Sequence, residues 1–263
     1  MSKSHKKGAA GRRIFCLPAT VMDISAAIAA SPLFPDRFRG DADLPDRLAA
    51  IVDCLIETNK KFNLTAITDP DGIVAKHILD SLVAAEAVAD AVGTGRARLL
   101  DVGSGAGFPG MPIAAACPRV TVTALDSTAK KCAYMNETAA TAGIANFTAL
   151  TGRAEEVARL ANQRESYDFV TARAVANLPV LCELCLPFLR VGGTFFALKG
   201  VNAPHEIADA ANAIAKLGGK LENSSEYHVP GDDAPRYLLT IRKISPTPAV
   251  FPRHYSQISK KPL

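Results

Sequence analysis

The sequence predicts an α/β fold, in which a mainly parallel β-sheet carries helices on both faces and is preceded by a small helical lobe. Three observations support this. Short apolar segments alternate with longer amphipathic ones after residue 94, a glycine-rich turn follows the first apolar segment, and residues 43–93 show helical periodicity only. Strands that alternate with helices are typical of parallel sheets, because each parallel connection must cross over the sheet.

The helical lobe is expected over residues 43–93. Apolar residues recur at helical spacing over 43–60, with Asp43 as a candidate N-cap and Pro45 in the first turn. A second amphipathic helix is expected to begin at Asp69-Pro70. Residues 1–42 begin with a basic, acid-free stretch, and we expect them to form a poorly ordered extension.

The sheet domain is expected over residues 94–244. The predicted strands are 98–102, 120–126, 147–151, 169–172 and 194–198, and the predicted helices are 109–117, 128–142, 154–162, 178–189 and 204–217. A last pair of strands, near 226–229 and 237–241, is expected to close the sheet, either parallel or antiparallel. Residues 245–263 are rich in proline and basic residues and are expected to form a loosely ordered tail.

The composition is typical of a globular protein, with 48% hydrophobic and 21% charged residues in a chain of 263. We expect no membrane-spanning helix, because no long uncharged apolar run is present. The six cysteines are scattered, and Cys182-x-x-Cys185 lies within a helical pattern without a second pair, so we expect a reducing, cytoplasmic environment and no metal site. The net charge is +4, but residues 1–13 and 242–263 carry +5 each, which leaves −6 between them. Basic ends suit contact with a polyanion.

The most informative motif is the turn Gly103-Ser104-Gly105-Ala106-Gly107, which follows a strand ending in Asp101-Val102. Glycines allow positive φ and close approach of a ligand, and the following helix is expected to offer free N–H groups to a carboxylate or phosphate. Asp126, at the end of the next strand, suits ribose hydroxyls. The spacing also fits a dinucleotide-binding motif, although Pro109 and Pro112 occupy places where a pyrophosphate would need N–H donors.

The chain resembles the family of ribosomal RNA small-subunit methyltransferase G, also called glucose-inhibited division protein B. The matching motifs follow one another from about residue 59 to residue 200. They are Asn63-Leu64-Thr65, Lys76-His77-Ile78-Leu79-Asp80-Ser81-Leu82, Asp101 to Pro112, Leu125-Asp126-Ser127, Gly152-Arg153-Ala154-Glu155-Glu156, Thr171-Ala172-Arg173-Ala174-Val175-Ala176 and Ala197-Leu198-Lys199-Gly200. One departure concerns a tryptophan that the family usually has near the position of Thr58. Its absence predicts different packing between the lobe and the sheet domain.

The resemblance implies a class I, Rossmann-like fold that uses S-adenosylmethionine and methylates N7 of a guanine in 16S ribosomal RNA. The implied partner is the small ribosomal subunit or its assembly intermediate, and we expect a monomer. No residue is identified as catalytic, because guanine N7 already has an available lone pair, but Arg173 and Lys199 are candidates for positioning. The substrate contacts implied are Asn63, His77 and Lys199. The cofactor contacts implied are Asp101, Gly103, Gly105, Phe108, Asp126, Ala154, Glu155 and Arg173.

Three other functions are considered. A class I methyltransferase for a small molecule or protein would share the glycine loop, but it would not account for the Asn63 and His77 motifs or the basic ends. A non-catalytic RNA-binding module would lack cofactor binding. An NAD-linked dehydrogenase would bind a nicotinamide cofactor instead.

Overall fold

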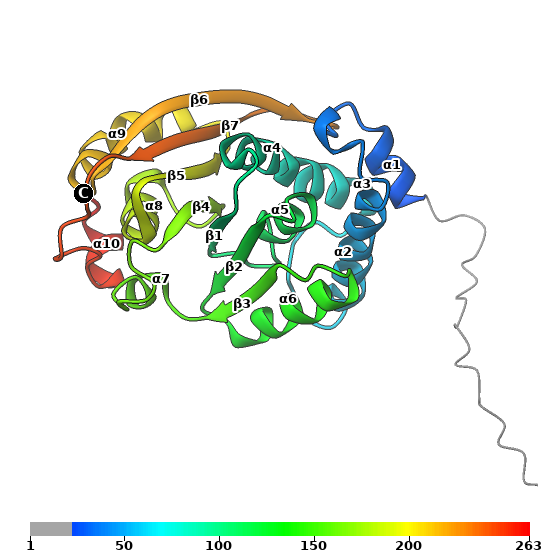
Figure 1. Ribbon diagram of the computed structural model, residues 1–263, viewed down its shortest axis with the longest axis horizontal. Helices are drawn as coiled ribbons and strands as arrows, with labels where there is room; N and C mark the ends of the chain where they lie inside the picture. Colours follow the sequence, from blue (N-terminus) through cyan, green and yellow to red (C-terminus); the bar gives the residue numbers. More distant parts are fainter. Residues whose placement is uncertain (1–22) are drawn as a thin grey trace, which may run out of the picture.

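The protein is built on one seven-stranded β-sheet (Figure 1), in a computed structural model that describes residues 23–263. The strands lie in the order β3-β2-β1-β4-β5-β7-β6. β1 to β5 are parallel, whereas β7 runs antiparallel to both β5 and β6, which resolves the direction that the sequence left open. The strands are β1 (Ala97–Val102), β2 (Val120–Asp126), β3 (Phe147–Thr151), β4 (Tyr167–Arg173), β5 (Leu189–Lys199), β6 (Gly219–Val229) and β7 (Asp232–Lys243).

Helices cover both faces of this sheet, as the strand–helix alternation predicts. The helices before and between the strands are α1 (Ile24–Ala30), α2 (Leu44–Asn59), α3 (Pro70–Ile73), α4 (Asp80–Val92), α5 (Gly110–Ala116), α6 (Ala129–Thr141), α7 (Ala154–Val157), α8 (Leu178–Cys185), α9 (Ala203–Lys216) and α10 (Tyr255–Lys260). Short 3₁₀ turns η1 (Asp36–Phe38) and η3 (Leu186–Phe188) and a π-helix η2 (Val74–Leu79) complete the set.

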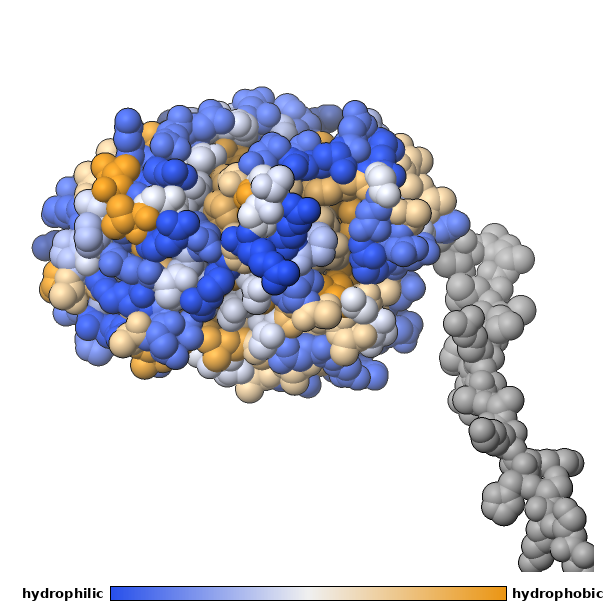
Figure 2. All heavy atoms as spheres, in the orientation of Figure 1, coloured by the Kyte–Doolittle hydropathy of each residue, from blue (hydrophilic) through white to orange (hydrophobic). Residues whose placement is uncertain are grey.

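The core has two parts because neighbouring strand residues point to opposite faces of the sheet. Leu99 belongs to the cluster under α2, α4, α5 and α6, while Leu100 belongs to the cluster under α8 and α9. Both residues are fully buried, as expected for a central parallel strand covered on both faces. Hydrophilic residues cover much of the outer surface in view (Figure 2).

The helical lobe begins as predicted, with one exception in its capping. Asp69 caps α3, because its carboxylate accepts the backbone N–H of Gly72 at 2.6 Å. Asp43 precedes α2 but makes no capping bond, because its backbone is helical rather than extended. α3, η2 and α4 follow one another without a break from Pro70 to Val92, so the second lobe helix contains a π-helical segment in its middle.

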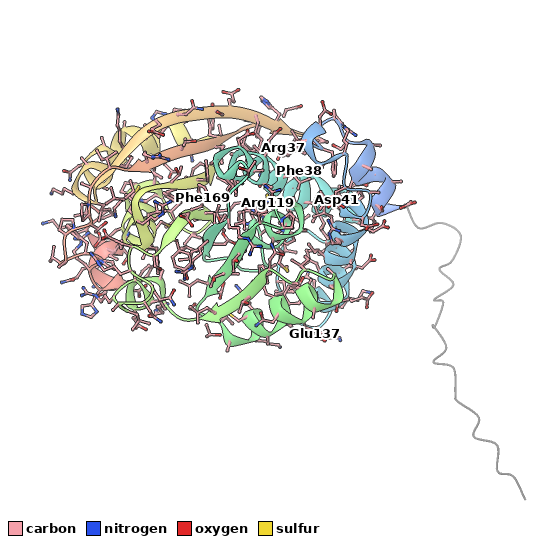
Figure 3. The ribbon with its side chains drawn as sticks, in the orientation of Figure 1. Arg37, Phe38, Asp41, Arg119, Glu137 and Phe169 are labelled. Atoms are coloured by element: carbon pink, nitrogen blue, oxygen red, sulfur yellow. The ribbon has the colours of Figure 1, made fainter. Side chains whose placement is uncertain are left out.

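The expectation of poor order over residues 1–42 is wrong for the part that can be described, while residues 1–22 lie outside the described residues. Residues 23–42 form α1 and η1 and bury Ile28 and Phe38 against the lobe. Arg37 forms an ion pair with Asp90 of α4. Figure 3 labels Arg37 and Phe38 among the side chains of the protein. α1 has only seven residues and six of them are apolar, so no polar face marks a helical period in the sequence.

The expectation of a loosely ordered tail over residues 245–263 is also wrong. The Arg253 guanidinium binds the fully buried carboxylate of Glu183 in α8, at 2.6 Å, and Ile258 of α10 is fully buried. Buried Lys243 donates to the carbonyl of Leu186 at 2.7 Å. Arg253 within the tail, and Lys243 at the end of β7, which also donates to the Thr247 hydroxyl, therefore hold the tail to the domain. The composition of the tail alone did not reveal this.

A cavity of about 470 Å³ lies between α2 and α6, where the missing tryptophan predicts altered packing. Thr58, Cys54 and Phe62 line one side, and Tyr134 and Thr138 line the other. The Tyr134 hydroxyl is buried without a hydrogen-bond partner among residues 23–263. The junction between the lobe and the sheet domain therefore has open space beside Thr58.

Filling this cavity should stabilise the protein. We expect Thr58→Trp to raise the free energy of unfolding by about 1 kcal/mol, which corresponds to a midpoint roughly 2–4 °C higher in thermal unfolding. Ala140→Trp, at an exposed site on α6 outside the cavity lining, is the control and should give no increase. An equal or lower midpoint for Thr58→Trp would show that the space beside Thr58 cannot accept an indole ring.

Candidate functional site

Asp101 fixes the glycine loop at the carboxyl end of β1. Its carboxylate is fully buried and accepts the Gly110 N–H at 3.0 Å, the Thr171 hydroxyl at 3.0 Å and the Ser104 hydroxyl. Burial raises the pKa of Asp101, and these three hydrogen bonds oppose that shift. Asp101 therefore shapes the loop from beneath and leaves no exposed atom for a ligand, so the direct cofactor contact expected from sequence is corrected to a positioning role.

The expectation of free N–H groups at the following helix is also corrected. The N–H of Gly110 binds Asp101, and the N–H of Met111 binds the carbonyl of Gly107 at 2.8 Å. The N–H of Ile113 binds the Pro109 carbonyl at 3.2 Å. The first turn of α5 is satisfied within the loop itself, and a ligand must be held by other groups.

Acceptors for a nucleoside lie at the carboxyl ends of β2 and β3. Asp126 is mostly buried, and each of its oxygens accepts one backbone N–H, from Gly105 at 3.0 Å and from Thr128 at 2.8 Å. Each oxygen keeps a second lone pair for a ribose hydroxyl. Glu155 is equally buried in the first turn of α7, beside Ala154, with Arg153 at 3.5 Å. The expected contacts of these two carboxylates with the ribose and the adenine of a cofactor stay predictions.

Two glycines of the loop have different surroundings. Gly105 has φ +61°, and a methyl group added there would meet nothing closer than the Gly103 carbonyl, at 3.9 Å. At Gly103, with φ +69°, an added Cβ would lie 2.6 Å from a methyl group of Val175. Val175 belongs to the segment 173–177 that follows β4, so this segment packs directly over the glycine loop.

Phe108, at the end of the loop, lies against the residues that the sequence assigns to the substrate. Its ring stacks on the His77 imidazole, with centroids 4.8 Å apart, and the Arg173 guanidinium lies 5.5 Å from its centre. The structure thus brings together Phe108, His77 and Arg173, which are separated by as many as 96 residues in the sequence.

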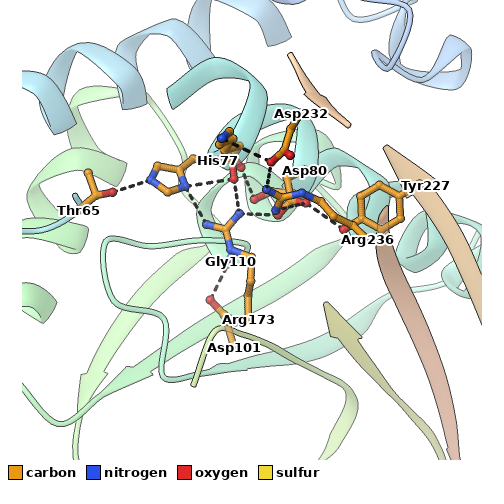
Figure 4. Close-up of polar contacts among 11 residues, drawn as sticks. Thr65, His77, Asp80, Asp101, Gly110, Arg173, Tyr227, Asp232 and Arg236 are labelled. Carbon is orange, nitrogen blue, oxygen red and sulfur yellow. Dashed lines mark hydrogen bonds and ion pairs between the residues drawn. The ribbon is translucent and has the colours of Figure 1, made fainter. Parts of the chain in front are cut away.

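Arg173 is turned toward the helical lobe (Figure 4). Its guanidinium donates to the Lys76 carbonyl at 2.8 Å and to the Asp80 carboxylate at 2.6 Å, and it lies 3.2 Å from Nδ1 of His77. The expected contact of Arg173 with a cofactor carboxylate or an RNA phosphate stays a prediction. What the structure adds is a link between the end of β4 and the π-helix η2.

Asp80 is the centre of a polar cluster that the sequence did not single out. It is 1% exposed and binds Arg173, the Tyr227 hydroxyl at 2.9 Å and Arg236 at 3.2 Å. Asp232 holds the other side of Arg236, also at 3.2 Å. Asp80 lies inside a motif already noted, but its partners come from β6 and β7 and could not be read from the local sequence.

A pocket of about 390 Å³ opens at this edge, within the range of small-molecule sites. Arg173, Lys199, Glu206, Tyr227 and Arg236 contribute to its lining. The Lys199 ammonium is largely buried, 2.6 Å from Glu206 and 2.9 Å from the Ala176 carbonyl. The predicted phosphate contact of Lys199 stays a prediction; in the structure its ammonium is paired with Glu206 and holds the segment 173–177.

Two asparagines lie in or beside the loop that follows α2, and they have different surroundings. Asn63 is exposed, and its predicted contact with substrate stays a prediction. Asn59 was not among the residues predicted from the sequence. It accepts the N–H of Leu64 at 2.7 Å and donates to the Thr65 carbonyl at 3.0 Å. Asn59 thereby shapes the loop that presents Thr65 to His77.

His77 is held as a neutral ring. Burial, with the nearby charge of Arg173, lowers the pKa of His77 to about 4. Its Nε2 lies 2.8 Å from the Thr65 hydroxyl. An N–H on Nε2 would leave Nδ1 as an acceptor facing Arg173, which suits a donor that is always protonated.

Two further properties concern residues 23–263. No group of three or more His, Cys, Asp or Glu residues in this part is arranged to hold a metal ion. No helix of the described chain is long and apolar enough to cross a membrane.

The family profile and the curated relatives agree on one family. A profile described as rRNA small subunit methyltransferase G matches residues 46–232. A protein of Clostridium perfringens strain 13 named ribosomal RNA small subunit methyltransferase G is 44% identical over 211 residues, covering 80% of this chain and 87% of that protein. Proteins with the same name from Symbiobacterium thermophilum and Alkaliphilus metalliredigens are 44% and 41% identical, covering 81% and 86% of this chain and 87% and 93% of their own lengths.

The neutral state of His77 predicts a specific loss of stability in acid. Because its folded pKa of about 4 lies below the ordinary 6.5, the unfolded chain binds the proton first as the pH falls. The contribution of neutral His77 to the free energy of unfolding is complete above about pH 6.5. It is lost as the pH falls from 6.5 to 4, and the total loss is up to about 3 kcal/mol.

Urea unfolding of wild type and His77→Gln at several values between pH 7 and pH 4 measures this loss. The stability difference between the two proteins should shift in favour of His77→Gln as the pH falls. Exposed His205→Gln is the control and should follow wild type. A constant difference between wild type and His77→Gln across the range would contradict the prediction.

Proposed function

The chain belongs to the family of rRNA small subunit methyltransferase G, and on this premise we propose that it transfers a methyl group from S-adenosylmethionine to N7 of a guanine in 16S ribosomal RNA. The family match covers the lobe motifs, the glycine loop and most of the sheet. The class I fold expected from the sequence is confirmed by a sheet in which β1 to β5 are parallel and β7 is inserted antiparallel beside β5. The proposed substrate is the small subunit or an assembly intermediate, encountered in the cytoplasm.

The observation that carries the proposal is the set of acceptors around the glycine loop. Asp126 ends β2, Glu155 lies in the first turn of α7 after β3, and Gly105 leaves open space beside Asp126. S-adenosylmethionine, when bound, supplies an electrophilic methyl group. Asp126 would bind its ribose hydroxyls, Glu155 and Ala154 would flank its adenine, and the backbone around Gly103 and Gly105 would lie against its methionine portion.

On the substrate side, the chain acts by positioning. Neutral guanine N7 carries a free lone pair, so no side chain has to remove a proton before transfer. Holding two reactants in the right geometry can lower a barrier by roughly 7–11 kcal/mol. The cluster of Arg173, Asp80 and Arg236 supplies rigid walls near the base. Because Asp80 and Asp232 together offset the two guanidinium charges, these walls limit electrostatic repulsion of the cationic product ring.

The cofactor site predicts different effects for two similar glycine substitutions. Gly105 and Gly143 have φ of +61° and +69°, and neither has side-chain atoms within 4 Å of an added Cβ, so alanine costs each about 1–2 kcal/mol of backbone strain. Only Gly105 lies beside Asp126. We expect Gly105→Ala to weaken S-adenosylmethionine binding at least about tenfold, roughly 1.4 kcal/mol, and Gly143→Ala to leave it unchanged in calorimetric titration. Equal affinities for the two variants would remove Gly105 from the site.

The proposed reaction is tested with small ribosomal subunits that lack the modification. Labelled methyl from S-adenosylmethionine should appear in a single guanine of 16S RNA, located by cleavage at 7-methylguanosine. Naked 16S RNA, tested in parallel, shows whether the assembled subunit is needed. Cofactor binding without label in either RNA would overturn the proposal and direct the search to a small-molecule or protein acceptor.

A further inference from the structure

Two carboxylates line the pocket at the ends of β4 and β5, and they differ in burial and in their hydrogen-bond partners. Asp80 is enclosed by Arg173, Arg236 and Tyr227, and its oxygens are occupied. Glu206, in the first turn of α9, is 20% exposed and lines the same pocket. Of the two, Glu206 is the carboxylate that can receive a ligand.

The orientation of Glu206 is fixed by contacts to one of its oxygens. Oε2 accepts the backbone N–H of Leu178 at 2.7 Å and lies 2.6 Å from the Lys199 ammonium. Both contacts end on Oε2, which leaves Oε1 without a partner among residues 23–263. A carboxylate oxygen has room for two hydrogen bonds, so Oε1 is an ordered, charged acceptor with open capacity.

Guanine has the complementary pattern. Its Watson–Crick edge presents the N1–H and N2–H₂ donors side by side, and N7 lies on the other edge of the ring. Enzymes that modify a base commonly extrude it, read its Watson–Crick edge and hold its faces between apolar or aromatic side chains. Val201, 58% exposed in the loop after β5, lines the pocket and offers such an apolar surface.

We propose that Glu206 selects guanine in this site, with Oε1 accepting hydrogen bonds from N1–H and N2–H₂ of the extruded base. This inference rests on the proposed function and names the residue that reads the base. With the Watson–Crick edge on Glu206, N7 is left free on the opposite edge of the purine. Adenine would place its N1 lone pair against the carboxylate and be rejected.

The segment 173–177 connects the pocket to the predicted cofactor site. Arg173 and Ala174 line the pocket, and the next residue, Val175, packs on Gly103 of the glycine loop. Lys199, which orients Glu206, also binds the Ala176 carbonyl. A base held by Glu206 would therefore be placed relative to the cofactor by a single connected set of contacts.

The test compares guanine with inosine at the target position of 16S RNA reconstituted into small subunits. Inosine keeps N7 and N1–H but lacks the N2 amine, so it loses one hydrogen bond to a charged acceptor. For the wild-type enzyme we expect kcat/KM for inosine to be lower than that for guanine by a factor of about ten or more. This is the usual effect of losing a hydrogen bond to a charged group.

Glu206→Gln is the diagnostic variant, because glutamine has the same shape. Its one oxygen is expected to remain with Lys199 and the Leu178 N–H, which turns an N–H₂ group toward the base. The guanine-to-inosine ratio of kcat/KM should then fall to about two or less, while S-adenosylmethionine affinity stays at the wild-type value. Asp209→Asn, on the exposed part of α9, is the matched control and should keep the wild-type ratio.

Each outcome has a defined meaning, because the ratio is measured within one protein and does not depend on how much of it is folded. A wild-type ratio in Glu206→Gln would show that Glu206 only holds Lys199 and Leu178, and would overturn this inference alone. Absence of labelled guanine with the wild-type enzyme would overturn the proposed function and this inference with it. A ratio that collapses in Glu206→Gln but not in Asp209→Asn supports the assignment.

Discussion

The buried carboxylate of Asp80 is the constraint on which the arrangement of this site depends. It begins α4 and joins three parts of the chain, through Arg173 at the end of β4, Tyr227 of β6 and Arg236 of β7. A charge buried this deeply is costly to desolvate, and such pairs are weak evidence for stability by themselves. Its effect is geometric, because its contacts tie the lobe, the parallel strands and the antiparallel hairpin to one another. The pocket is the space that this arrangement leaves.

The π-helix η2 extends this constraint to the rim of the site. A π-turn inserts an extra residue into a helix and changes the direction of its side chains, and such turns are frequent at functional sites. Here η2 presents the Lys76 carbonyl and the His77 ring to Arg173, while Asp80 follows directly in α4. Thr65 holds the far side of His77. Both sides of the ring are thus fixed, which is consistent with burial keeping it neutral.

The sequence predicts the sheet well because each strand carries its own local pattern of apolar residues. The five parallel strands and the glycine loop follow from alternation and spacing alone. The tail is different, because Arg253 is ordered by Glu183, 70 residues away, and composition shows only that it is basic. The site shows the same division. Asp126 lies at the end of a recognisable strand. The roles of Asp101, Lys199 and Arg236 depend instead on partners in other elements of the chain, which no local pattern specifies.

The segment 173–177 then explains how the two halves of the site can act as one. Arg173 is tied to Asp80, Val175 rests on Gly103, and the Ala176 carbonyl is held by Lys199. A methyl transfer that needs no proton removal depends mainly on distance and alignment, so precision in this wall matters more than any acid or base. Because Arg173 and Lys199 are each paired with a carboxylate, the wall carries its charges in balance. It can therefore border a base that becomes cationic on methylation without opposing that change.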